Sequence, residues 1–168
     1  KKNLIYIPYN DIEKSSKILN KFKNDINCII IEPIQACLPL GNTKNYLKFL
    51  ENFCNKNNIT LIFDELITGI RIRPGSIQKK YNIDADITAI GKILGGGLPI
   101  GAIGISKKIN KIIKKKNIKV FFGGTFSGNS LSSFVGNETL KFLFKNKKLF
   151  SNLNKKCFYF QKSLNQFI

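Results

Sequence analysis

Four short apolar segments, each unbroken and each ended by a polar or ionisable residue, constrain the fold of this chain most strongly. They are residues 28–32 (CIIIE), 60–65 (TLIFDE), 86–92 (DITAIGK) and 101–106 (GAIGIS). Continuous rather than alternating hydrophobicity is typical of strands that helices cover on both faces. We therefore predict four buried strands in a sheet sandwiched by helices.

The segments between and after these strands carry helical patterns. Apolar residues recur at helical spacing in residues 43–58, with Thr43 as the expected N-cap and Asn57-Asn58 as the expected end. A strand, a helix and a strand in this order predict parallel strands with a right-handed crossover. Further helices are expected within residues 11–24, after Asn129 and after Ser151. The predicted fold class is α/β, a three-layer sandwich with a mostly parallel sheet.

Three ionisable residues close predicted strands, namely Glu32, Asp64 and Lys92. Ligands of parallel α/β sheets bind beyond the carboxyl ends of the strands, so these side chains are expected at one ligand-binding edge. A lysine at an apolar strand end is expected to be partly desolvated, which favours the nucleophilic free amine and suits a Schiff base. Three simpler interpretations stay open: Lys92 only reaches water, Asp64 caps a helix, or Asp64 forms a structural ion pair, for instance with Lys92.

Two glycine-rich segments could bring backbone close to a ligand. Residues 95–101 (GGGLPIG) follow Lys92 but match neither a Walker A loop nor G-x-G-x-x-G. Residues 123–130 (GGTFSGNS) combine glycines, hydroxyls and a helix start, which indicates either a phosphate site or an ordinary capped helix.

Composition excludes several function classes. The chain has no histidine, which removes Ser-His-Asp triads, Cys-His pairs and histidine metal sites, and we expect no metal. Its four cysteines form no C-x-x-C pair, as expected for reduced thiols of a cytoplasmic protein. No apolar stretch is long enough to span a membrane, and no membrane partner is expected.

The net charge of +18 raises nucleic acid as a partner. All basic residues except Arg71 and Arg73 are lysines, whereas base and phosphate recognition favour arginine. The lysines interleave with helical apolar positions, as expected of solvated helix faces. A basic nucleic-acid-binding module is therefore the alternative from another class, and we expect no nucleic-acid partner.

Residues 61–71 (LIFDELITGIR), 81–104 (YNIDADITAIGKILGGGLPIGAIG) and 123–129 (GGTFSGN), in this order and spacing, resemble the class III pyridoxal 5'-phosphate-dependent aminotransferases. The resemblance implies the fold type I of pyridoxal-phosphate enzymes. It also implies that residues 1–168 are part of the large cofactor-binding domain, with its N-terminal part and a small C-terminal domain outside the chain.

The resemblance assigns roles residue by residue. Lys92 matches the lysine that holds pyridoxal 5'-phosphate as a Schiff base and moves the substrate proton. Asp64 matches the carboxylate that pairs with the pyridinium nitrogen. Leu66 matches the aliphatic residue on the ring face, and Thr125 the threonine that reaches the cofactor phosphate of the partner subunit. Glu32 matches a Glu-Pro element near the active site.

The implied activity is that of an aminotransferase or aminomutase acting on a small amino donor and acceptor, in a homodimer with composite active sites. Ile67 stands where the family's aminomutases carry an apolar residue and many ω-aminotransferases carry glutamine. It favours an aminomutase, with a transaminase of other substrates as the alternative, although residues 36–42 (ACLPLGN) and Ser130 depart from the usual aminomutase sequence. An inactive relative is a third hypothesis, against which the presence of both Asp64 and Lys92 argues.

Overall fold

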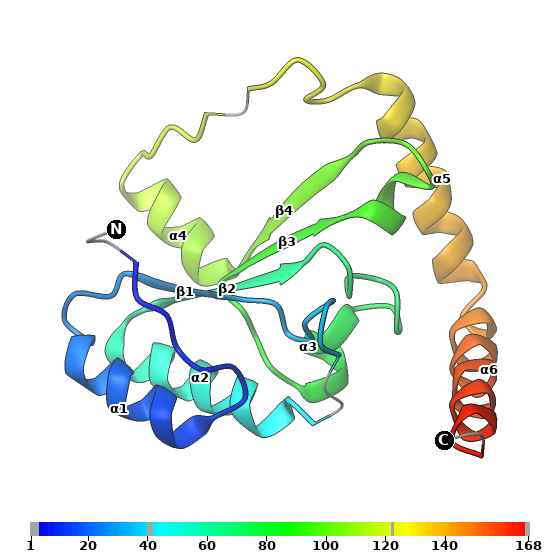
Figure 1. Cartoon of the computed structure of the whole chain (residues 1–168). Helices are drawn as coiled ribbons and strands as arrows, with labels where there is room; N and C mark the ends of the chain where they lie inside the picture. Colours follow the sequence, from blue (N-terminus) through cyan, green and yellow to red (C-terminus); the bar gives the residue numbers. More distant parts are fainter. Residues whose placement is uncertain (1–3, 40–41, 122, 167–168) are drawn as a thin grey trace.

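A four-stranded sheet of order β1-β2-β3-β4 forms the centre of the chain, which the computed structural model describes for residues 4–39, 42–121 and 123–166 (Figure 1). The strands are β1 (Cys28–Ile31), β2 (Thr60–Glu65), β3 (Ile87–Gly91) and β4 (Gly101–Ile105). The first three are parallel, and β4 returns antiparallel to β3. All four predicted strands are confirmed, and so is the α/β class with a mostly parallel sheet.

The described residues also form six α-helices and one short 3-10 helix. They are α1 (Ile12–Phe22), α2 (Lys44–Asn57), α3 (Ser76–Tyr81), the 3-10 helix η1 (Lys92–Gly95), α4 (Lys107–Lys115), α5 (Ser130–Lys145) and α6 (Lys148–Leu164). Of these, α2, α3 and η1 connect consecutive strands. The helices expected in residues 11–24, after Asn129 and after Ser151 are confirmed. Helix α3 escaped prediction because six residues are too few to show a periodic pattern.

The ends of α2 show one confirmed prediction and one difference. Asn58 follows the last helical residue in the left-handed conformation, and its N–H bonds to the Cys54 carbonyl. Thr43 occupies the N-cap position, but its hydroxyl makes no bond to the helix. The hydroxyl donates instead to the Pro33 carbonyl at 3.0 Å, which ties the start of α2 to the segment that follows β1.

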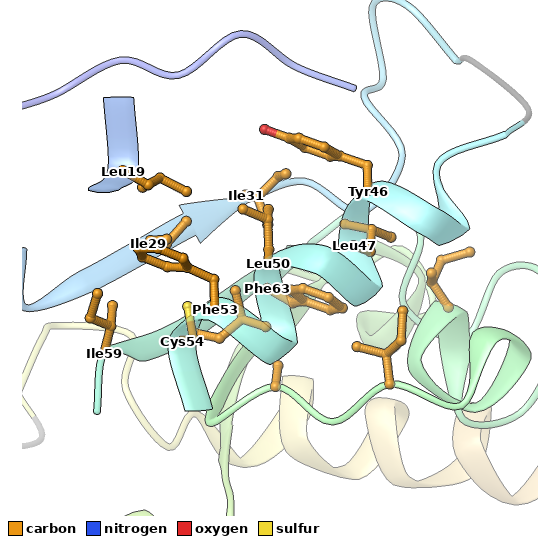
Figure 2. Close-up of a cluster of buried hydrophobic side chains, with 14 residues drawn as sticks. Leu19, Ile29, Ile31, Tyr46, Leu47, Leu50, Phe53, Cys54, Ile59 and Phe63 are labelled. Carbon is orange, nitrogen blue, oxygen red and sulfur yellow. The ribbon is translucent and has the colours of Figure 1, made fainter. Parts of the chain in front are cut away.

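The main core lies between the sheet and helices α1, α2 and α3, which cover the same face (Figure 1). Alternate residues of β2, Leu61 and Phe63, are buried on this face. Figure 2 shows Phe63 against the apolar stripe of α2. The labelled members of the cluster are Leu19, Ile29, Ile31, Tyr46, Leu47, Leu50, Phe53, Cys54, Ile59 and Phe63. Burial of this single face therefore holds β1 and β2 in register.

The opposite face of the sheet is more open in the part of the chain that the structure describes. Strand register places Ile30, Ile62 and Asp64 on it, together with Ile103 of β4. Ile30 is 66% exposed and Ile103 is 71% exposed. The unbroken apolar runs predicted helices on both faces, whereas the described helices bury only one face of β1 and β2. The runs therefore mark strands that are apolar on both faces, and the described helices cover one of these faces.

A second, smaller cluster packs α5 and α6 against the ends of β3 and β4. Its buried members are Ile70, Leu94 and Phe150, and partly buried residues of η1 and α5 surround them. Helix α5 contacts η1 directly, so the turn that begins at Lys92 rests on this helix. In the described ranges, no helix is long and apolar enough to cross a membrane, and no cluster of acidic or cysteine side chains is suited to hold a metal ion.

Candidate active site

The parallel strands bring the three predicted ionisable residues to the same edge of the sheet. Glu32 follows β1 directly. Asp64 is the penultimate residue of β2 and pairs with Ala89 of β3, and Lys92 follows β3 as the first residue of η1. Their order along the edge follows the strand order β1-β2-β3. The expected arrangement of an amine and two carboxylates along one sheet edge is therefore present, and ligand binding there stays a prediction.

Asp64 is half-buried, and its Oδ1 accepts a hydrogen bond from the Leu66 N–H at 3.1 Å. Among the described residues, Asp64 forms no ion pair and caps no helix. Neither the ion pair nor the helix cap that the sequence left open for Asp64 is thus found among the described residues, and its pairing with a cofactor nitrogen stays a prediction. Its Oδ2 accepts no hydrogen bond from the described residues.

Lys92 has a left-handed backbone conformation, with φ of +48°, which is unfavourable for a residue with a Cβ. Such strain persists only where the surroundings impose it, and it is frequent at functional sites. The side chain is exposed. The prediction of a partly desolvated lysine is therefore wrong for the described chain, since nothing covers the open face of the sheet beside it.

Close packing around the Lys92 turn explains two glycines, Gly91 directly before the lysine and Gly136 on α5. A Cβ on Gly91 would lie 2.8 Å from Cδ2 of Leu66, so the Leu66 side chain sits against the residue that precedes the lysine. A Cβ on Gly136 of α5 would lie 3.0 Å from the Leu94 carbonyl oxygen. Helix α5 therefore approaches η1 as closely as a glycine allows, and Leu66, 38% exposed, lies beside the Lys92 turn.

Glu32 and Ile67 lie at the rim of this edge and are partly buried. Oε2 of Glu32 accepts the Ala36 N–H at 3.1 Å, which folds the loop after β1 back on itself. The Tyr9 hydroxyl donates to the Glu32 carbonyl at 3.2 Å, and burial raises the pKa of Tyr9 to about 12. The Ile67 carbonyl accepts from Nε of Arg71 at 3.0 Å. Both residues thus have defined positions beside Asp64.

Thr125 is exposed in the loop before α5. It lines a cavity of about 430 Å³ together with residues 99–101, the rest of residues 124–129, and residues 132–133. Asn129 caps α5 by accepting the Ser132 N–H at 3.0 Å, so the expected helix start is confirmed, whereas the phosphate site stays a prediction. Phe122, which directly precedes the glycine-rich segment 123–130, lies outside the described residues.

One group near the site was missed by the sequence analysis. Glu65 follows Asp64 and is completely buried on the opposite face of β2, where it bonds to Thr68, Ile77 and Gln78. A charged residue at a buried position of an otherwise apolar strand is the only sequence signal that marks it. Its partners are not apparent from sequence, because they depend on the position of α3.

The sequence profile of the family described as aminotransferase class III matches residues 3–167. The chain belongs to the class III aminotransferase family. Glutamate-1-semialdehyde 2,1-aminomutase of Wigglesworthia glossinidia brevipalpis is 48% identical over 162 residues, which are 94% of this chain and 36% of that protein. The enzyme of the same name from Flavobacterium psychrophilum is 37% identical over 166 residues, 97% of this chain and 38% of its own.

Solved structures of transaminases share the fold. An ornithine aminotransferase of Plasmodium yoelii has a TM-score of 0.79 and 30% identity, over 95% of this chain and 42% of its own. An ω-transaminase of Sphaerobacter thermophilus has a TM-score of 0.72 and 28% identity, over 81% of this chain and 32% of its own. These similarities confirm the class III resemblance and the transaminase fold. The chain spans just over a third of the length of the curated relatives described above.

Proposed function

We propose that the protein is a pyridoxal 5'-phosphate-dependent aminomutase that moves the amino group of glutamate-1-semialdehyde between neighbouring carbons. The observation that carries the proposal is the placement of Asp64 and Lys92 on adjacent strand ends, in a chain whose relatives include aminomutases of that name. The substrate comes from those relatives. The chemistry rests on the two side chains.

The side chains present at the sheet edge suit this cofactor. Pyridoxal phosphate, when bound, supplies an aldehyde that reacts with amines and a protonated ring that withdraws electrons. Lys92 offers an exposed primary amine. Asp64 offers a carboxylate oxygen, Oδ2, that accepts no hydrogen bond from the described residues. Leu66 adds an exposed aliphatic surface beside the Lys92 turn, against which a ring can pack. These three residues therefore fit the group.

Each of these residues has a separate proposed role. Nζ of Lys92 would hold the cofactor and, as a free amine, could take a proton from one carbon of the substrate and return it to another. The Asp64 carboxylate would face the ring nitrogen and favour its protonated form. Glu32 and Ile67 border the space beside Asp64, and the apolar Ile67 side chain excludes water there without adding a charge.

We also propose a two-fold homodimer with composite sites. Thr125 lines a cavity whose described lining contains neither Lys92 nor Asp64. The neighbouring Phe126 is 72% exposed and Phe121 is 90% exposed, an apolar surface typical of a contact region. A second copy placed against this loop covers the aromatics and brings the Thr125 hydroxyl to the phosphate of the partner's cofactor.

Residues 1–168 belong, in this proposal, to the large cofactor-binding domain of a longer, cytoplasmic enzyme. The three-layer sandwich is complete only when further chain covers the open face that carries Asp64 and Ile103. The cysteines within the described ranges are free thiols, consistent with a reducing compartment.

Product analysis tests the reaction. Full-length protein loaded with pyridoxal phosphate is expected to isomerise glutamate-1-semialdehyde without a second amino acceptor, and Lys92→Ala is expected to abolish the reaction. Lys107→Ala, which removes an exposed lysine at the start of α4, serves as the matched control and should retain activity. If the semialdehyde is unchanged while amino groups pass from another donor to a 2-oxo acid, the alternative of a class III transaminase is correct.

Mixing an inactive Lys92→Ala variant with a Thr125→Ala variant, which should bind the cofactor more weakly, tests the composite site. A heterodimer of Thr125→Ala and Lys92→Ala subunits has one doubly damaged site and one site with both residues intact. We expect partial activity to return on mixing. If subunits exchange and activity stays absent, Thr125 does not serve the partner's site.

A further inference from the structure

A buried carboxylate lies directly behind the candidate active site. Glu65 is the last residue of β2 and has no exposed surface. Its side chain points toward the helix layer with those of Leu61 and Phe63, whereas Asp64 points to the opposite face. Among the described residues, no lysine or arginine pairs with it. A carboxylate in this position is strongly destabilising unless hydrogen bonds satisfy its oxygens.

Three donors from the segment that follows β2 satisfy Glu65. Its Oε2 accepts the Thr68 hydroxyl at 3.0 Å and the Ile77 N–H, in the first turn of α3, at 3.1 Å. Its Oε1 accepts the side-chain amide of Gln78 at 3.2 Å. The carboxylate therefore binds the loop after Asp64 and the start of α3 to the end of β2.

Gln78 extends this network to β3. Its Nε2 also donates to the Thr88 hydroxyl at 2.9 Å, and its Oε1 accepts the Ala85 N–H at 2.9 Å. Thr88 is the register partner of Phe63 on the buried face of the sheet. Glu65 and Gln78 together therefore bridge β2 and β3 through side chains, next to the strand ends from which Asp64 and Lys92 extend.

The backbone of Glu65 is held as firmly as its side chain. The Gly69 N–H donates to the Glu65 carbonyl at 2.8 Å, and a Cβ on Gly69 would lie 2.5 Å from that oxygen. The turn between these residues contains Leu66, whose N–H bonds to Asp64 and whose side chain contacts Gly91. A shift of Glu65 therefore moves Asp64, Leu66 and the residue that precedes Lys92.

We propose that Glu65 is a positioning residue that fixes the Asp64 carboxylate relative to Lys92 through its bonds to Thr68, Ile77 and Gln78. The inference rests on the proposed cofactor chemistry, in which Asp64 must meet the ring nitrogen while Lys92 holds the ring. Glu65 touches neither substrate nor cofactor, and it acts through the strand end.

A carboxylate is required because every partner of Glu65 is a donor. In Glu65→Gln, one end of the new amide is itself a donor and faces another donor. Gln78 cannot turn its amide oxygen toward the new donor without losing its bond from the Ala85 N–H. The substitution keeps size and shape, so the network changes while the packing of the core is retained.

The test uses full-length protein titrated with pyridoxal phosphate, read by the visible absorption band of the bound cofactor and by the pH midpoint of that band. We expect Glu65→Gln to weaken cofactor binding about ten-fold, the worth of one hydrogen bond to a charged group. The midpoint should move in the same direction as in Asp64→Asn and by less. In an Asp64→Asn background, Glu65→Gln should move the midpoint no further.

Thr68 supplies the second variant and the matched control. Thr68→Val removes one donor to Glu65 and should shift the midpoint in the same direction, so the proposal remains testable if Glu65→Gln fails to fold. Thr68→Ser keeps the hydroxyl and should behave like the wild type.

The inference is overturned if folded Glu65→Gln, or Thr68→Val in its place, retains the wild-type midpoint, or if the shifts of Glu65→Gln and Asp64→Asn simply add. A lower thermal stability with an unchanged band would show a purely structural role. If the wild-type protein gives no band with pyridoxal phosphate, the proposed function fails and this inference fails with it. That outcome differs from a normal wild-type band that the variants leave unchanged.

Discussion

The turn that carries Lys92 should be intolerant of a single methyl group at Gly96. Gly96 ends η1 in the left-handed conformation, with φ of +58°. A Cβ built there would lie 2.2 Å from Oγ1 of Thr139 and 3.2 Å from Cγ1 of Val135, both on α5. Gly96→Ala therefore introduces backbone strain and a clash with the helix that supports the turn.

The two effects have separable magnitudes. Left-handed backbone costs a residue with a Cβ about 1–2 kcal/mol. Forcing a methyl group into a packed contact costs about 1–3 kcal/mol. Gly96→Ala should thus lower the free energy of unfolding by about 2–5 kcal/mol, the sum of these two contributions.

Thr139 allows the clash to be removed without touching the strain. In a Thr139→Ala background, the nearest Thr139 atom to the new methyl group is Cβ, at 3.5 Å, an ordinary contact. Gly96→Ala should then cost the strain of about 1–2 kcal/mol together with the smaller cost of the 3.2 Å contact with Cγ1 of Val135, which remains. Urea unfolding of the full-length single and double variants gives the coupling free energy. An identical loss in both backgrounds would refute the packing of α5 on this turn.

Three further predictions concern other parts of the site and core. Burial raises the pKa of the Cys54 thiol from 9.0 to about 12, so the unfolded state loses this proton first and the free energy of unfolding should fall as pH rises from 9 to 12. Cys54→Ala should make that decline shallower, and an equal slope would contradict the assignment. Asp86→Ala should destabilise the protein by about 1–3 kcal/mol, since its carboxylate accepts the buried Leu61 N–H at 3.1 Å; a loss below about 0.5 kcal/mol in urea unfolding would contradict this. Asp64→Asn should keep the wild-type unfolding temperature while turnover falls about 100-fold or more, and unchanged turnover would make the carboxylate merely structural.

Local patterns predicted the strands and longer helices because each signal lies within a few residues of the element it marks. The apolar run of residues 60–65 marks β2, and Asn57-Asn58 marks the end of α2. The same patterns placed Glu32, Asp64 and Lys92 at one edge, since parallel strands end together.

What failed depends on contacts between distant residues. The exposure of Lys92 depends on what covers the second face of the sheet, which no local pattern specifies. The network of Glu65, Gln78 and Thr88 joins a strand, a short helix and the next strand, so it becomes visible only when these elements are in place. The hydroxyl of Thr43 likewise bonds across the fold to Pro33 rather than to its own helix.

Trapping the cofactor on its lysine tests the central claim most directly. Full-length protein is loaded with pyridoxal phosphate, reduced with borohydride and digested, and the modified peptide is mapped by mass spectrometry. All but two of the chain's 28 basic residues are lysines, so nonspecific attachment would spread the label over many peptides. The account predicts a single labelled peptide carrying the modification on Lys92. Stoichiometric label on any other lysine, with Lys92 unmodified, would contradict it.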